Sequence, residues 1–174
     1  MSDDASLVER SLAGDSAALG ELVDRFQQPV FALCLKLLRH RQDAEDVAQE
    51  SLVRMCRHLA TYDVTRPLIS WVLAIAANRC RTAIEGRSRR PIPVEEVPAV
   101  AAPLPEITSL PEEVDQALST LRPEIRTCMI LFYLNELSLA EISETMDVPI
   151  GTLKTWLHRG RNELSAKLPK NLFD

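Results

Sequence analysis

The chain has 174 residues, with 20 Lys and Arg against 25 Asp and Glu and a formal net charge of −5. Its 46% apolar and 26% charged residues are typical of a globular protein with one or two small domains. No stretch reaches the ~18 consecutive apolar residues that span a bilayer, and the acidic N-terminus lacks the apolar segment of a secretion signal.

The N-terminal part is predicted to form successive helices. Asp15 is a suitable N-cap for a first run of apolar residues at helical spacing. The pattern resumes after Pro29, a third run extends from Ala48 to Leu59, and a fourth begins near Leu68. Because no convincing period-2 strand accompanies these runs, we expect an all-α chain.

Acidic side chains gather in the segment DAEDVAQE, residues 43–50. The helix dipole favours carboxylates in a first turn, which by itself explains Asp43 and Glu45. The three histidines lie far apart, and the four cysteines lack zinc-site spacing and suit a reducing cytoplasm. We therefore expect no catalytic residues, no metal and no cofactor. The functional alternative for the acids is a polar face for a partner protein.

A basic segment, residues 66–90, coincides with the fourth predicted helix. It carries six Lys or Arg, including Arg66, and one acid. At about 100° per residue, Trp71, Asn78 and Arg81 group on one side of the helix. An aromatic ring, an amide and a guanidinium side by side suit a strand with exposed bases better than a closed duplex. The alternatives are a core position for Trp71 and a local backbone hydrogen bond for Asn78.

A proline-rich segment, residues 91–111, separates this part from the rest of the chain. It holds six of the eleven prolines, three acids and no basic residue. Such proline density blocks helices and sheet ladders and favours an extended chain. We interpret it as an interdomain linker, and the alternative is a long surface loop within one domain.

The C-terminal part carries two helix-start signals. Ser109 and Glu112 have capping-box spacing, and Ser138 and Glu141 have it again. The sequence VPIG then interrupts a short apolar helix, and a longer basic helix is expected from Thr152 onwards. A short helix, a tight break and a longer basic helix predict a helix-turn-helix.

The last predicted helix has two different faces. Leucines and Gly160 share one face, where the glycine would let another helix approach closely. The opposite face and its margin carry hydrogen-bond donors: Lys154, Thr155, His158, Arg159 and Asn162. Donors at the start of such a helix suit the reading of base edges in a major groove. The alternative is a solvated basic surface.

The net charge conceals an uneven distribution. Residues 1–65 sum to −4, residues 66–90 to +5, residues 91–147 to −9 and residues 148–174 to +3. The two positive segments coincide with the two helices that carry candidate nucleic-acid contacts. With so few phosphate contacts on an acidic chain, we expect weak DNA binding by the free protein.

Three segments together resemble a known family. DAEDVAQESLVRM, then SWVLAIAANRCRTAI followed by arginines, then LSLAEISETMDVPIGTLKTWLHRGRNEL are similar in order and content to extracytoplasmic-function (ECF) sigma factors of the bacterial sigma-70 family. The resemblance implies two small helical domains: region 2 over residues 1–90, a Pro-rich acidic linker over 91–111, and region 4 over 112–174. It implies a cytoplasmic transcription initiation factor for a specialised regulon.

The resemblance also implies roles for individual residues. The surface that grips the clamp helices of the polymerase β′ subunit corresponds to Asp46, Gln49, Glu50 and Arg54. The contacts with the melted −10 strand correspond to Arg66, Trp71, Asn78 and Arg81, and residues 62–70 match a loop that captures a flipped-out base. The −35 recognition positions correspond to the donor face of the last helix.

The implied partners are core RNA polymerase, through its β′ clamp helices and β flap, promoter DNA and a cognate anti-sigma factor, which in this family is often membrane-anchored. Two other classes remain open at this point. A helix-turn-helix regulator acting without polymerase would explain residues 112–170 but leave DAEDVAQE and residues 66–90 unexplained. A degenerate sigma-like protein that only binds an anti-sigma factor would explain the fold.

Overall fold

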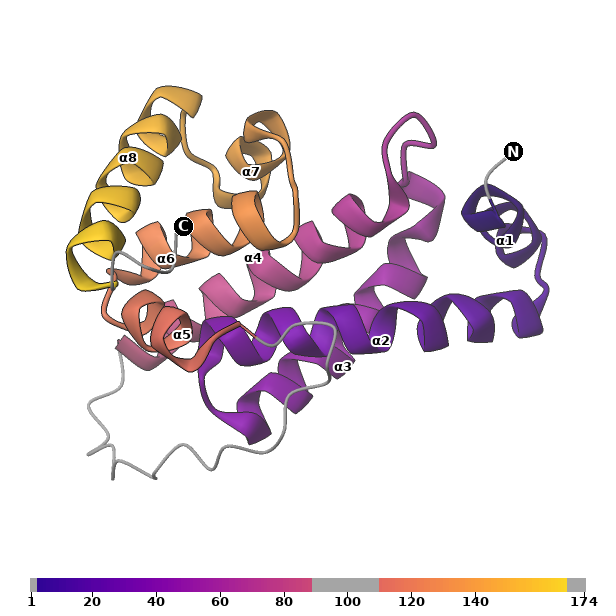
Figure 1. Ribbon diagram of the computed structural model, residues 1–174. Helices are drawn as coiled ribbons and strands as arrows, with labels where there is room; N and C mark the ends of the chain where they lie inside the picture. The colour runs from indigo at the N-terminus through magenta and orange to yellow at the C-terminus, as the bar shows by residue number, and fades with distance from the viewer. Residues whose placement is uncertain (1–2, 89–109, 169–174) are drawn as a thin grey trace. The chain divides into compact units, whose positions relative to one another are not determined.

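The computed structural model describes residues 3–88 and 110–168, and every regular element in these ranges is a helix (Figure 1). The all-α prediction is therefore confirmed. The chain divides into two compact units, residues 1–101 and residues 102–174. Most of the predicted linker, residues 91–109, lies outside the described residues.

The first unit is built around one long helix, α2. Its elements are α1 (Asp3–Leu12), α2 (Ser16–Leu38), α3 (Arg41–His58), the 3₁₀ turn η1 (Leu59–Thr61) and α4 (Leu68–Ser88). Helix α2 packs against α1, α3 and α4, and α3 also packs against α4 (Figure 1). The interior is filled by large apolar side chains, among them Leu22, Leu33, Met55 and Leu73. Burying each of these contributes about 1.5–3 kcal/mol.

Helix α2 begins as predicted but does not end at the proline. The Asp15 carboxylate accepts hydrogen bonds from the backbone N–H groups of Ala17 (3.0 Å) and Ala18 (3.1 Å), which confirms the N-cap. The expected interruption at Pro29 is wrong, because α2 continues through it to Leu38. A proline inside a helix costs about 3 kcal/mol. Buried Phe26 and Val30 continue the apolar stripe on either side of it, and their packing offsets that cost.

The second unit surrounds the last helix, α8. Its elements are α5 (Glu112–Ser119), α6 (Pro123–Met129), the π-helical turn η3 (Ile130–Leu134), α7 (Leu139–Met146) and α8 (Ile150–Lys167). Helix α8 packs against α5, α6 and α7. Helix α5 begins after Pro111, which caps it without a side-chain hydrogen bond, and Ser109 of the predicted capping box lies outside the described residues.

Helices α7 and α8 form the predicted helix-turn-helix. Ser138 and Glu141 make the capping box: the Ser138 N–H donates to the Glu141 carboxylate (2.8 Å), and the Glu141 N–H donates to the Ser138 hydroxyl (3.3 Å). Asp147 ends α7 in the left-handed region at φ 54°. The Ser143 hydroxyl then donates to the Val148 carbonyl (2.6 Å) and closes the turn. Helix α8 begins two residues earlier than expected, at Ile150.

Gly160 is the point of closest approach between α6 and α8. A Cβ atom at this position would lie 2.8 Å from the Met129 sulfur and 3.1 Å from Cγ2 of Ile125. Real Cβ atoms do not approach other atoms so closely, so the absence of a side chain permits this packing. The predicted close approach at Gly160 is therefore confirmed.

Replacing Ser138 with alanine is expected to loosen the helix-turn-helix. The substitution removes the cap of α7 and costs about 1 kcal/mol, which corresponds to roughly fivefold faster exchange of the amides that it protects. Hydrogen exchange followed by mass spectrometry over α7 measures this change. Ser165→Ala, at an exposed position of α8, is the control and should leave α7 unchanged. Equal α7 protection in wild type and Ser138→Ala would show that the cap does not support the motif.

Candidate nucleic-acid interface

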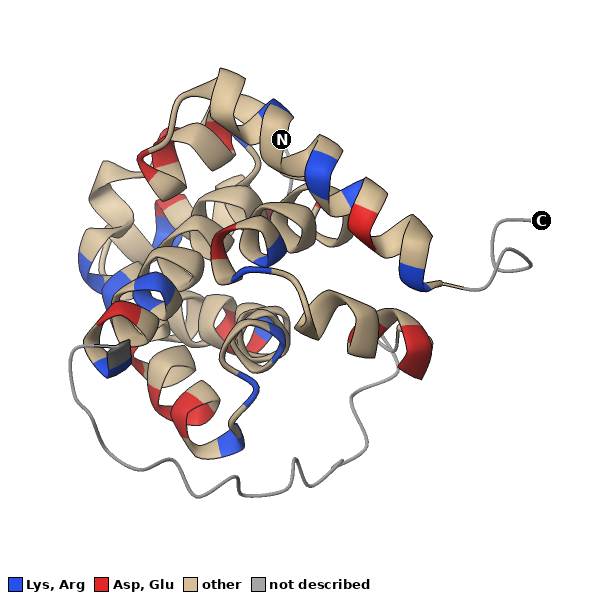
Figure 2. Cartoon of the chain, turned by 90° about the vertical axis from the view of Figure 1, so that its left-hand side faces the viewer, with Lys and Arg blue, Asp and Glu red and all other residues tan. Residues whose placement is uncertain are grey.

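The exposed face of α8 carries the five predicted contact residues. Leu153, Leu157 and Gly160 are buried and fix the rotation of the helix against the second unit. As a result the side chains predicted from the sequence all face solvent: Lys154, Thr155, His158, Arg159 and Asn162. Basic segments predominate along this helix, which leads to the C-terminus (Figure 2). The helix therefore presents a rigid row of donors to any ligand in front of it.

Three of these side chains are ordered by hydrogen bonds within α8. The Asn162 amide lies 3.2 Å from the Nε2 atom of His158, one turn earlier. The Thr155 hydroxyl donates to the Gly151 carbonyl (3.1 Å). Helix α8 begins after Pro149, and no side chain caps its first N–H groups. Uncapped N–H groups at a helix start favour a nearby phosphate.

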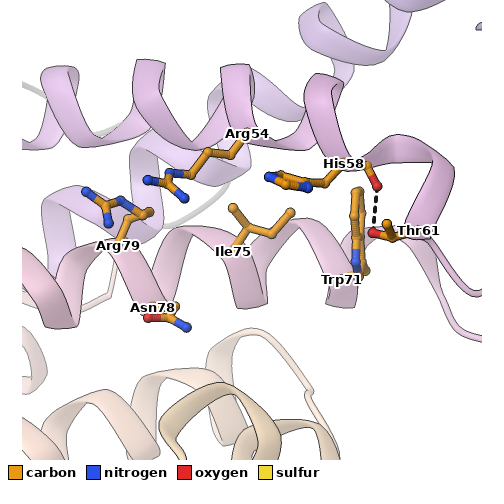
Figure 3. Close-up of a pocket in the computed structure, with 7 residues that line it drawn as sticks. All are labelled: Arg54, His58, Thr61, Trp71, Ile75, Asn78 and Arg79. Atoms are coloured by element: carbon orange, nitrogen blue, oxygen red, sulfur yellow. Dashed lines mark hydrogen bonds between the residues drawn. The ribbon is translucent and has the colours of Figure 1, made fainter.

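A second candidate site is a pocket of about 300 Å³ between α3 and α4 (Figure 3). Its walls come from α3, η1 and α4: Arg54, His58, Thr61, Trp71, Ile75, Asn78 and Arg79. Arg54 and His58 extend from α3 towards α4, and the guanidinium of Arg79 lies next to that of Arg54 (Figure 3). The pocket therefore combines an aromatic ring, an amide and two cations, the side chains that suit an unpaired strand.

Trp71 and Asn78 occupy different environments in this pocket. Trp71 is half-buried, and its ring packs against Tyr62 with centroids 5.4 Å apart, so it is both a packing residue and part of the pocket wall. Asn78 is exposed, and within the described residues its amide makes no hydrogen bond. The alternative of a local backbone hydrogen bond for Asn78 is therefore not realised, and the amide is available to a ligand.

The loop between η1 and α4 is held by its own side chains. The Tyr62 hydroxyl donates to the carbonyl of Arg66, and the Thr65 hydroxyl donates to the Asp63 carboxylate (2.7 Å). This hydrogen bond lowers the pKa of Asp63, and burial raises the pKa of Tyr62. The loop next to Trp71 is therefore folded before any ligand binds.

Two predicted contact residues do not line the pocket. Arg66 is exposed on the loop, 4.0 Å from the Asp63 carboxylate. Arg81 is half-buried on α4, where it pairs with Glu85 at 3.6 Å. The structure thus brings only Trp71 and Asn78 of the four predicted strand contacts into the pocket.

The predicted polymerase-binding residues form a row along α3. Asp46 and Gln49 are exposed, whereas Glu50 and Arg54 are half-buried and pair with each other at 3.2 Å. Glu50 also accepts a hydrogen bond from Arg79 of α4 (2.9 Å), which lowers the pKa of its carboxyl group. Glu50 and Arg54 thus belong both to the α3 row and to the edge of the pocket.

The sequence did not predict four residues of the pocket as site residues: His58, Thr61, Ile75 and Arg79. His58 lies one helical turn after Arg54, and Arg79 follows Asn78, so both were adjacent to predicted positions. Their role depends on the packing of α3 against α4, which no local pattern encodes. A helix-turn-helix in one unit, and in the other a pocket that combines an aromatic ring, an amide and two cations, are typical of a protein that binds nucleic acid through both units.

Comparison with known proteins identifies the family. A family model described as Sigma-70 region 2 matches residues 22–90, and one described as Sigma-70, region 4 matches residues 111–164. The chain is 32% identical to the ECF RNA polymerase sigma factor SigW of Bacillus subtilis, over 89% of this chain and 91% of the relative. It is 30% identical to the ECF RNA polymerase sigma-E factor of Escherichia coli, over 95% and 94%. The chain belongs to the sigma-70 family, as an ECF RNA polymerase sigma factor.

Solved structures share the fold. The sigma factor RpoE of Bartonella quintana, solved with the anti-sigma factor NepR, matches 84% of this chain and 94% of that chain with a TM-score of 0.67 and 22% identity. CnrH, solved with the cytosolic domain of CnrY, matches 94% and 95% with a TM-score of 0.60 and 21% identity. In the described ranges, residues 3–88 and 110–168, no helix has the length and apolar character needed to cross a membrane.

Proposed function

We propose that this sigma factor directs core RNA polymerase to the −10 and −35 elements of a specialised set of promoters. The pocket between α3 and α4 is the observation that carries the proposal, because it adds a site for an unpaired strand to a helix-turn-helix. A regulator that binds a double-stranded operator needs only the helix-turn-helix. The polymerase performs the chemistry, and the sigma factor contributes no catalytic residue.

Residues 1–90 would bind the −10 element and keep its strand open. An opened strand exposes base faces, on which aromatic rings stack, and phosphates, which arginines attract. The pocket offers Trp71 for stacking, Asn78 for hydrogen bonds to base edges, and Arg54 and Arg79 for phosphates. Arg66 and Arg81 would meet the strand outside the pocket.

Residues 112–174 would read the −35 element with α8, while residues 91–111 connect the two units. The first turns of a recognition helix reach the base edges, and its basic groups meet phosphates. Arg159 is exposed on this face, about one turn after Thr155. An arginine there can donate two hydrogen bonds to a guanine.

The α3 row would bind core polymerase. Asp46, Gln49, Glu50 and Arg54 present carboxylates, an amide and a cation along one helix, which suits a polar helical partner such as the β′ clamp helices. The β flap is the expected partner of the second unit. A sigma factor of similar fold was solved with an anti-sigma factor, and CnrH was solved with the cytosolic domain of CnrY; this supports an anti-sigma partner for this chain in the cytoplasm.

Asn78→Ala is expected to slow strand opening more than closed-complex formation. The substitution removes an exposed amide at the edge of the pocket without disturbing the core, at a cost of about 1 kcal/mol, or roughly fivefold, in the opened complex. Permanganate footprinting measures opening, and a band shift with holoenzyme measures binding. A pre-melted template should restore the rate.

The exposed Thr82, one turn further along α4 and outside the pocket lining, supplies a control as Thr82→Ala. If pre-melted template does not rescue Asn78→Ala, this residue has no role in strand opening. Band shifts with and without core polymerase separate the two classes of protein. Promoter-specific binding by the free chain, undiminished without core, would favour a regulator over an initiation factor.

A further inference from the structure

One carboxylate, that of Glu50, pairs with two arginines that line the pocket. Arg54, one turn further along α3, donates from Nε at 3.2 Å. Arg79, on α4, donates from Nη2 at 2.9 Å. Because both guanidinium groups lie at one end of the pocket, Glu50 removes one of the two positive charges that the pocket offers to a phosphate (Figure 3).

The two arginines are the pocket's fully charged groups, and a carboxylate competes directly with a phosphate for them. Both anions accept the same charge-assisted hydrogen bonds from a guanidinium. The buried Nε atom of Arg79 has no hydrogen-bond partner within the described residues, so this guanidinium is held by its hydrogen bond to Glu50. The Arg79 side chain is 26% exposed, and its Nη2 atom is engaged by Glu50.

We infer that Glu50 is an intramolecular competitor of nucleic-acid phosphate, which holds Arg54 and Arg79 in the free chain and thereby weakens its binding to single-stranded DNA. This inference rests on the proposed function, in which the pocket holds the opened −10 strand. Glu50 is also accessible: 42% of its side chain is exposed on the same helix as Asp46 and Gln49. A partner docked on α3 that took this carboxylate would release both arginines to the strand.

Glu50→Gln tests the inference, with Glu45→Gln as the matched control. Glu45 lies on the same helix and pairs at 2.8 Å with Arg41, outside the pocket, so both substitutions remove one negative charge from a surface ion pair. The measurement is the fluorescence anisotropy of a mixed-sequence single-stranded DNA oligonucleotide titrated with the full chain, without polymerase, over a range of salt concentrations.

The expected result for Glu50→Gln is about fivefold tighter binding at low salt. The slope of the logarithm of the binding constant against the logarithm of the salt concentration should become steeper by roughly 0.7 to 1.4, which corresponds to one or two further phosphate contacts with a single strand. Glu45→Gln should change the affinity by less than about twofold, as expected for a remote screened charge. Adding both Arg54→Gln and Arg79→Gln to Glu50→Gln should abolish the gain. Equal gains from Glu50→Gln and Glu45→Gln, no gain from Glu50→Gln, or a gain that survives the loss of both arginines would each overturn the inference.

Run-off transcription by the wild-type chain with core polymerase separates this inference from the proposed function. Promoter-specific transcripts together with an unchanged oligonucleotide affinity of Glu50→Gln would refute only the competition by Glu50. Absence of transcripts would refute the initiation function itself, whatever the oligonucleotide shows.

Discussion

Arg159→Ala is expected to lower promoter binding by the holoenzyme by roughly 5- to 150-fold, the equivalent of about 1–3 kcal/mol for a side chain that contacts a base edge. Arg159 is exposed on the donor face of α8, whereas Leu157 and Gly160, its near neighbours in the chain, are buried. The substitution therefore removes a contact without disturbing the packing. The measurement is holoenzyme affinity for a promoter fragment and for the same fragment with a scrambled −35 element.

Arg161→Ala is the charge-matched control for Arg159→Ala. Arg161 is exposed on the same helix but about 160° away from Arg159 at 100° per residue, on the flank of the donor face. Its loss should weaken both fragments equally. Binding of core polymerase, measured by size-exclusion chromatography, should be unchanged in both variants. Loss of polymerase binding by Arg159→Ala would show that this face of α8 does not read the −35 element.

Gly160→Leu is expected to unfold the second unit under conditions in which the first remains folded. Even a Cβ atom at this position would overlap Met129 at 2.8 Å. A flexible methionine can yield to one methyl group, but a leucine would also have to displace Ile125, and such overpacking costs about 1–3 kcal/mol or more. A helix-turn-helix that cannot seat α8 on α6 should then lose −35 binding as well.

The two tryptophans allow each unit to be observed separately, because Trp71 lies in the first unit and Trp156 in the second. In a Trp71→Phe background, urea unfolding followed by Trp156 fluorescence reports the second unit alone. Gly151→Leu is the control, since nothing lies within 4 Å of a Cβ atom at that position of α8. Equal unfolding midpoints for Gly160→Leu and Gly151→Leu would contradict the close-packing account.

Features that depend on neighbouring residues in the chain could be predicted from the sequence. The cap at Asp15 and the capping box at Ser138 are formed by side chains and N–H groups within three residues of each other. The buried face of α8 followed from its leucines and Gly160 alone. Such local patterns are sufficient to predict an all-α fold, because the geometry of a helix determines which of its own side chains share a face.

Features that depend on packing between helices could not be predicted. Pro29 should interrupt a helix by its local chemistry, yet burial on both sides keeps α2 continuous. Helix α1 went unrecognised because its first turns are polar, although it buries Leu7 and Val8. The ion pair between Glu50 and Arg79 joins residues 29 positions apart, so the link between the α3 row and the strand pocket appears only in three dimensions.

Run-off transcription with purified core RNA polymerase tests the central claim most directly. Genomic DNA fragments of the bacterium that encodes this chain serve as templates. Core polymerase alone and core polymerase with the Arg159→Ala variant are the controls. The account predicts discrete transcripts from a small set of fragments that require the wild-type chain and decline sharply with the variant. No transcript above core alone from any fragment would contradict the assignment of this chain as a promoter-specific initiation factor.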